Sequence, residues 1–302
     1  MPHGAQSRRT RPRGRHDLAG SSRPRRKARG SRSRGRLTAL RCTVEYDGTE
    51  FHGFQRQASV RTVAGVLEDA LAKIFGERIA VTGAGRTDAG VHATGQVVSF
   101  RTPGAFPAER LAVALNAVLD DDLAVRDVAE AGDDFSARRC ALERTYVYAI
   151  LNRAAPSPLL ARYAWHVRRA LDLDAMIAAA AHLAGEHDFR SFCALPENGR
   201  TVRRLSECAL DRRGELVRLQ VSADGFLHHM VRAMVGTLVE CGDGRRDPAS
   251  LLAVLAARER RAAGITAPAR GLYLAGVRYA GYDSYGEPWV GEVPPARPPE
   301  LR

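Results

Sequence analysis

The sequence predicts an α+β fold made of two consecutive halves, each with the element order β-α-β-β-α-β. From residue 37 onward, short β-branched and apolar runs alternate with segments whose apolar residues recur at helical spacing. The same order of runs and helical segments repeats after residue 143. Two split β-α-β units in tandem are typical of two ferredoxin-like halves with largely antiparallel sheets. The same order also arises in unrelated α+β chains.

Six elements are expected in the first half. Leu37–Tyr46 reads as a strand, which the turn-forming pair Asp47-Gly48 closes. Thr62 is a suitable N-cap for the next helix, because its hydroxyl can accept a hydrogen bond from a free backbone N–H. The remaining elements are expected at 63–75 (helix), 79–82 and 96–100 (strands), 107–119 (helix) and 123–131 (strand).

The second half repeats this order. Arg144–Leu151 reads as a strand, and Asp172 is the expected N-cap of a helix that runs to about Leu183. A hairpin is expected about Arg213-Gly214. The other elements are expected at 202–210 and 216–221 (the hairpin strands), 227–240 and 250–257 (helices) and 274–279 (strand).

The predicted division of the chain follows from these patterns and from the charge. It has a disordered basic arm at 1–36, an N-terminal domain at 37–142, a C-terminal domain at 143–282 and a flexible Pro-rich tail at 283–302.

The net charge of +12 is concentrated in the arm. Residues 1–36 contain thirteen of the 46 basic and one of the 34 acidic residues, so the remainder, with 33 of each, is neutral. The arm is rich in Arg, Gly, Ser and Pro and holds little to bury, which predicts disorder. One interpretation is an RNA-binding arm held by phosphate electrostatics. The other is a non-functional extension or a start codon placed too early.

The remaining composition is that of a globular protein with one large or two modest domains. No stretch approaches the apolar length of a membrane span, and no apolar signal segment follows the basic start. The five cysteines stand far apart without a C-x-x-C pair. This spacing disfavours structural zinc and a disulfide framework and indicates the reducing cytoplasm.

The most informative stretch begins at Gly83 and reads GAGRTDAGVHATG. Its glycines permit positive φ and the close approach of another molecule. Arg86 and Asp88 are two residues apart, so on an extended chain they face one side and can pair, which favours the ionised, nucleophilic carboxylate. On these residues alone, Asp88 is more often a turn-former. The stretch fits neither the dinucleotide fingerprint, whose third glycine Asp88 replaces, nor a P-loop.

The run Gly85–Gly90 with Val91-His92 and Thr94–Val98 resembles the signature of the TruA-type tRNA pseudouridine synthases, whose R-T-D-A-G-V-H aspartate is the nucleophile. The resemblance implies the two-domain architecture of that family, with the catalytic cleft between the halves. Residues 193–199 match no family pattern. Further segments agree in order from about 37 to 282: YDG at 46–48, GFQRQ at 53–57 (Phe54 for the usual Trp), RTY at 144–146, DFRSF at 188–192, FLHHMVR at 226–232 and GLYL at 271–274.

The resemblance implies roles for four residues near the target base. Asp88 is the implied catalytic nucleophile, and Arg86 is a candidate to hold Asp88 and to fill the space that the base vacates. Tyr146 matches the active-site tyrosine of the family, which can stack under a uracil or relay the C5 proton. Leu274 is implied to pack against the base. Both roles of Tyr146 stay open, and a core position is the alternative for Tyr146 and Leu274.

His229 and Arg232 lie three apart on an expected helix, so they share a face and could hold phosphate or wall the cleft. His228 and His229 are adjacent and would point in different directions on a helix. Zinc binding needs i, i+4 spacing and a third ligand, and neither is evident, so no metal site is expected.

The implied function is that of an isomerase which converts uridine to pseudouridine in the anticodon stem-loop of tRNA, at positions 38, 39 and 40 in the family pattern. The resemblance implies no metal or organic cofactor and a homodimer. The N1–C1′ bond must break and C5 must bond to C1′, and the carboxylate could attack either C1′ or C6. The alternative is a non-catalytic RNA-binding or RNA-folding protein with the same fold.

Overall fold

A computed structural model describes residues 37–104, 106–194 and 200–288. The predicted arm at 1–36 and the part of the predicted tail from residue 289 onward lie outside the described residues. Within the described part, no helix has the length and apolar character needed to cross a membrane.

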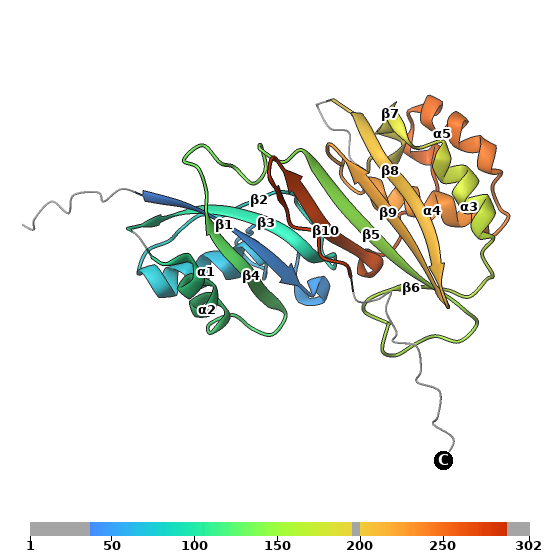
Figure 1. Ribbon diagram of the computed structural model, residues 1–302. Helices are drawn as coiled ribbons and strands as arrows, with labels where there is room; N and C mark the ends of the chain where they lie inside the picture. Colours follow the sequence, from blue (N-terminus) through green and yellow to red (C-terminus); the bar gives the residue numbers. More distant parts are fainter. Residues whose placement is uncertain (1–36, 105, 195–199, 289–302) are drawn as a thin grey trace, which may run out of the picture. The chain divides into compact units, whose positions relative to one another are not determined.

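The first half folds as a four-stranded antiparallel sheet with two helices (Figure 1). Its strand order is β4-β1-β3-β2, the order of a split β-α-β unit. The Thr62 hydroxyl accepts from the Gly65 backbone N–H at 3.3 Å and begins the first helix as predicted. The elements are β1 (Leu37–Tyr46), α1 (Val63–Phe75), β2 (Thr82–Gly83), β3 (His92–Pro103), α2 (Ala108–Asn116) and β4 (Leu123–Glu130).

The second half repeats this arrangement. Its four main strands lie in the order β10-β5-β9-β8, which is again fourth, first, third, second along the chain. These elements are β5 (Glu143–Asn152), α3 (Leu173–Ala181), β8 (Val202–Arg213), β9 (Leu216–Ala223), α4 (Met230–Gly242) and β10 (Leu272–Tyr279). Additional elements are β6 (Trp165–Val167), β7 (Gly185–Asp188), α5 (Leu251–Ala257) and β11 (Tyr282–Asp283). Short 3-10 turns lie at Gly48–Glu50, Phe189–Phe192, Pro248–Ser250, Arg260–Ala262 and Ala269–Gly271.

Strand β10 joins the two halves into one sheet (Figure 1). It pairs antiparallel with β5 and, over Tyr273 and Leu274, parallel with the start of β3 at His92 and Ala93. The β3–β10 and β5–β6 pairs are the parallel ones, and the other strand pairs are antiparallel. One hydrophobic cluster includes buried residues of both halves. The predicted α+β fold with two β-α-β-β-α-β halves is therefore confirmed.

The strands that flank the glycine-rich stretch differ from the prediction. The strand expected at 79–82 is reduced to Thr82–Gly83, and β3 starts at His92, four residues before the predicted Gln96. Ile79 is buried without being in a strand, so its β-branched side chain reflects core packing. His92 extends the strand because β10 supplies a pairing partner that local sequence cannot reveal.

The segment 283–288, predicted to be flexible, is held against the sheet. The Ser284 hydroxyl donates to the Gly95 carbonyl on β3 at 2.7 Å and accepts from Val277 N–H on β10 at 2.9 Å. The Gly286 N–H donates to the Ala275 carbonyl at 2.9 Å. These bonds tie the segment to strands of both halves, which corrects the predicted start of the tail.

Candidate active site

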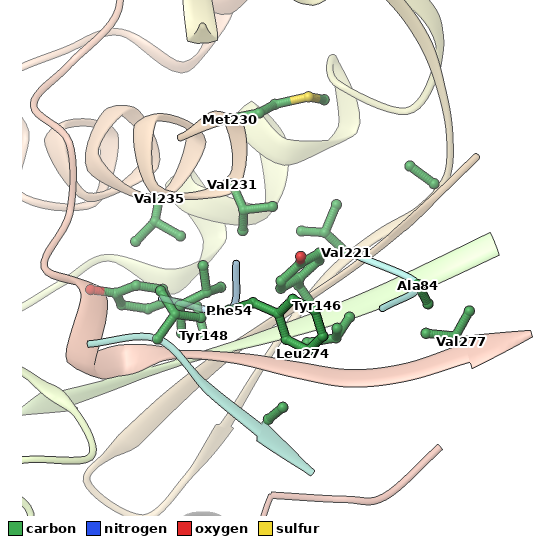
Figure 2. Packing of buried hydrophobic residues seen from close by; sticks show 14 of the residues in the cluster. Phe54, Ala84, Tyr146, Tyr148, Val221, Met230, Val231, Val235, Leu274 and Val277 are labelled. Atoms are coloured by element: carbon green, nitrogen blue, oxygen red, sulfur yellow. The ribbon is translucent and has the colours of Figure 1, made fainter. Parts of the chain in front are cut away.

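A cavity of about 880 Å³ lies where the two halves meet. One wall is the loop from Gly83 to Asp88 in the first half, and the other includes Tyr146 on β5 and the segment 225–232 that leads into α4. Val231 and Val235 anchor α4 on the sheet residues around Tyr148 (Figure 2). Five of the six predicted site residues line this cavity; the sixth, Leu274, does not.

The loop that carries Asp88 is held by side chains from three strands. The Gln96 side chain on β3 donates to the Gly85 carbonyl at 2.7 Å and accepts from the Gly85 N–H at 3.3 Å. The half-buried Arg144 guanidinium on β5 donates to the Ala84 carbonyl at 3.1 Å. The hydroxyls of Tyr46 and Thr87 lie 2.9 Å apart. Sequence reasoning gave Gln96 and Arg144 no part in the site, because their partners are backbone atoms that no motif identifies.

Phe54, at the position where the resemblance expects Trp, supports the loop from beneath. It is buried, and a Cβ added to Gly83 would lie 2.4 Å from its ring, so only glycine permits this contact. Gly53 has φ of 89° and lets the Phe54 N–H reach the Thr87 carbonyl at 3.0 Å. Phe54 therefore acts through packing.

The carboxylate of Asp88 faces the start of α4. The Arg232 guanidinium donates from Nη1 to Oδ2 at 3.0 Å, and Nε2 of His229 lies 3.3 Å from the same oxygen. Nε2 of His228 lies 3.6 Å from Oδ1. The Asp88 side chain is 25% exposed and lines the cavity. Arg232 and His229 thus face the same carboxylate oxygen.

The predicted pairing of Arg86 with Asp88 is not made. Within the described ranges, the basic side chains beside Asp88 are those of His228, His229 and Arg232, and Arg86 is exposed at the cavity wall. Thr87, which lies between Arg86 and Asp88 in the sequence, points into the core and contacts the Tyr46 hydroxyl. Arg232 approaches from 144 residues further along the chain and occupies the carboxylate oxygen that Arg86 was expected to hold.

The two histidines stack instead of diverging. Their ring centroids are 3.8 Å apart with an interplanar angle of 25°. The expectation of different directions assumed a helix from Leu227, but α4 starts at Met230 and the histidines form the turn before it. His229 has φ of 61°, which brings its ring alongside that of His228.

Tyr146 and Leu274 lie directly behind Gly85. A Cβ added to Gly85 would be 3.5 Å from the Tyr146 hydroxyl and 3.7 Å from a Leu274 methyl group. Figure 2 shows Tyr146 and Leu274 within the buried cluster. Tyr146 lines the cavity and packs edge-on against Phe226, with ring centroids 5.0 Å apart. Burial, with a smaller effect of the charges of Tyr46 and Asp88, raises the pKa of Tyr146 well above its usual range, so its phenol stays protonated at neutral pH.

The cavity is strongly basic. Two aspartates, Asp88 and Asp224, line it together with seven arginines: Arg86, Arg138, Arg139, Arg144, Arg200, Arg203 and Arg232. Charge of this density focuses positive potential in a concave surface and favours a polyanionic ligand. Guanidinium groups suit phosphate in particular.

The donor set fits a divalent cation poorly. Asp88, His228 and His229 offer ligand atoms within 4.8 Å of one another, so tertiary contact supplies the third ligand that the sequence did not show. The stacked rings, however, cannot both direct an Nε2 lone pair at one ion in their ring planes without separating. Arg232 occupies the carboxylate, and the surrounding arginines repel a cation.

A carboxylate at the wall of an arginine-rich cavity between two α+β halves defines an enzyme site for a phosphate-bearing substrate. A model of the tRNA pseudouridine synthase family matches residues 42–138 and 179–280. "tRNA pseudouridine synthase A" of Moorella thermoacetica is 48% identical over 246 residues, which cover 80% of this chain and all of the relative. The proteins of that name from Brevibacillus brevis and Pelobacter propionicus are 46% and 42% identical, again over 80% of this chain and all of each relative. The chain therefore belongs to the tRNA pseudouridine synthase family.

Proposed function

We propose that this protein converts uridine to pseudouridine in the anticodon stem-loop of tRNA, at positions 38, 39 and 40, with Asp88 as the nucleophile. The observation that carries the proposal is the Asp88 carboxylate, which projects into a cavity lined by seven arginines from both halves. The family of the chain supports the reaction and the tRNA substrate.

The chemistry needs a carboxylate that can form a bond to carbon and then leave it. In one route, an oxygen of Asp88 bonds to C1′ while the C1′–N1 electron pair passes to the uracil. When C5 bonds to C1′, the oxygen departs with its electron pair. In the other route, the oxygen adds to C6 while the C5=C6 electron pair moves towards the C4 carbonyl. The C1′–N1 pair then passes to N1, C5 bonds to C1′, and the oxygen leaves C6 with its electron pair as C5=C6 forms again. In both, N1 gains a proton and C5 loses one. The Arg232 cation stabilises the departing carboxylate in either route.

The other predicted residues are proposed to hold the target base. The base must leave the helical stack, and Arg86, which lines the cavity, is proposed to fill the space behind it. Tyr146 stacks under the uracil, with Leu274 packed behind it. Because Leu274 is fully buried, its proposed effect on the base passes through Tyr146 and Gly85. His229 and Arg232 wall the cavity and hold Asp88.

We also propose, from the family resemblance, a homodimer that acts in the cytoplasm without metal or organic cofactor. All five cysteines lie among the described residues and none of them forms a disulfide, which suits a reducing compartment. Sedimentation of the full chain with and without tRNA tests the dimer.

The experiment that tests the activity uses an unmodified tRNA transcript tritiated at C5 of uridine. Pseudouridine formation releases the C5 tritium, so wild-type protein should release it and Asp88→Asn should not. Binding of tRNA by Asp88→Asn should stay within about tenfold of wild type, because many phosphate contacts carry the affinity. Turnover by Asp88→Asn would remove Asp88 as the nucleophile. Tight tRNA binding by wild type without any release would favour a non-catalytic RNA-binding protein.

A further inference from the structure

The turn before α4 holds an unfavourable backbone conformation next to Asp88. His229 has φ of 61° and ψ of 7°, the left-handed region that costs free energy for any residue with a Cβ. In the described ranges, His229 and Arg258 are the non-glycine residues with positive φ. Such conformations persist only where surrounding contacts impose them, and they gather at functional sites.

The ring of His228 packs directly against the ring of His229. The two rings stack with centroids 3.8 Å apart, and His228 is 38% exposed on its cavity side. The backbone carbonyl of His228 accepts from the Ala194 N–H at 3.2 Å, and this hydrogen bond fixes the backbone of the turn. His228 therefore restricts the rotation of the neighbouring ring.

The proton of His228 is best placed on Nε2. Its Nδ1 is buried and has no hydrogen-bond partner among the described residues. A buried N–H without an acceptor costs more than a buried lone pair, so Nδ1 carries the lone pair. With Nε2 already protonated, His228 cannot take a proton from the cavity side through this atom. Its role is thus to place other groups.

The two oxygens of Asp88 are held unequally. Oδ2 receives the Arg232 guanidinium at 3.0 Å and has His229 at 3.3 Å. Among the residues that the structure describes, the ion-pair contact of Oδ1 is His228, at 3.6 Å, which is too long for a hydrogen bond. The electron pair of Oδ1 is therefore the freer one. The Arg232 donor on Oδ2 would also stabilise the carbonyl oxygen while Oδ1 is bonded to carbon.

We propose that His228 is a positioning residue that acts through His229. By stacking, it keeps His229 in the strained conformation in which His229 and Arg232 hold Oδ2 and leave Oδ1 free to attack. This inference rests on the proposed function, in which Asp88 is the nucleophile. Oδ1 gives an electron pair to the carbon that it attacks, and the same C–O bond breaks with the pair returning to Oδ1.

The test is a double-mutant cycle on the full chain. His228→Ala removes the stack, and His229→Gly removes the second ring while suiting φ of 61°. Tritium release is measured in single turnovers at saturating tRNA. We expect each single variant to slow release at least about tenfold, with tRNA affinity within about threefold. The double variant should be no more than about threefold slower than His229→Gly, because residues that act as one unit are not additive.

Two further variants separate stacking from a folding defect. His228→Phe keeps a flat ring and should be at least about threefold faster than His228→Ala. His187→Ala is the matched control, since His187 also meets an aromatic ring, Phe189 at 5.9 Å, but does not line the cavity. It should release tritium at the wild-type rate.

Two results would overturn the inference: wild-type release by His228→Ala, or independent effects that multiply in the double variant. An inactive wild type or an active Asp88→Asn would instead overturn the proposed function, before the histidine variants are compared.

Discussion

Replacing Gln96 tests whether the loop that carries Asp88 depends on one buried amide. Gln96 is fully buried on β3, and its side chain satisfies both the carbonyl and the N–H of Gly85. Gln96→Met keeps a similar length and removes both hydrogen bonds. Gln96→Glu keeps the acceptor but places a second, charged oxygen against the Gly85 carbonyl.

The structure sets the size of each effect. Two neutral hydrogen bonds contribute about 0.5–1.5 kcal/mol each, and Gly85 lines the cavity, where water can replace part of the loss. Gln96→Met should therefore lower the free energy of unfolding by about 1–3 kcal/mol. A shift of the loop by about 1 Å can slow a reaction about 10²-fold, so turnover should fall by about 10–10²-fold. Gln96→Glu should be worse on both counts, because it also buries a charge.

Urea unfolding and tritium release at saturating tRNA measure the two effects. The control is Thr102→Val on the same strand, because the Thr102 hydroxyl is buried without a partner in the described ranges. Its removal should leave stability unchanged or slightly higher and turnover at the wild-type level. The reasoning is refuted if Gln96→Met unfolds and turns over like wild type, or if Gln96→Glu performs better than Gln96→Met.

Three other predictions test separate features. Tyr146→Phe should stay within about tenfold of wild-type tritium release and Tyr146→Ala should lose about 10²-fold, because burial raises the pKa of the phenol and so leaves almost no phenolate to act as a base at neutral pH. The reverse order would assign the hydroxyl to proton relay. Burial also lowers the pKa of His92, so below about pH 6.5 the unfolded chain binds a proton that the folded protein does not. The free energy of unfolding should therefore fall as the pH drops below about 6.5, by at most about 1.4 kcal/mol per pH unit. His92→Asn should make the urea midpoint depend less on pH. An unchanged pH dependence would show that His92 is not its source. A chain ending at Asp283 should be about 2–4 kcal/mol less stable than one ending at Pro288, because it loses the bonds of Ser284 and Gly286; equal midpoints would show that these bonds contribute nothing net.

The sequence alone determined the order of the main elements but not the short strands β6, β7 and β11, because helix and strand periodicity are local properties that show only in longer segments. Thr62 and Asp172 cap their helices as predicted, each through a side-chain oxygen that accepts a backbone N–H three residues on. The repeat of β-α-β-β-α-β was visible for the same reason. The glycine-rich loop and its aspartate also stood out locally, and the family segments set beside them identified the class of protein.

Tertiary structure decided how the halves meet. β10 lies beside β3, although about 170 residues separate them and no local pattern records that pairing. This contact moved the start of β3 back to His92. Because strands of both halves lie side by side, residues 284–287 can hydrogen-bond to both of them. A segment whose composition predicted flexibility is therefore bound to the sheet.

Tertiary structure also decided which groups hold Asp88. Two-residue spacing favoured Arg86, but the docking of α4 on the sheet brings Arg232 to Oδ2 and leaves Arg86 exposed. A helix from Leu227 would have pointed His228 and His229 in different directions. The helix instead starts at Met230, and the two rings stack in the turn before it. Spacing constrains only which neighbours along the chain can touch. The partner that a carboxylate binds is selected by packing, which brings together residues distant in sequence and excludes the solvent that would otherwise compete.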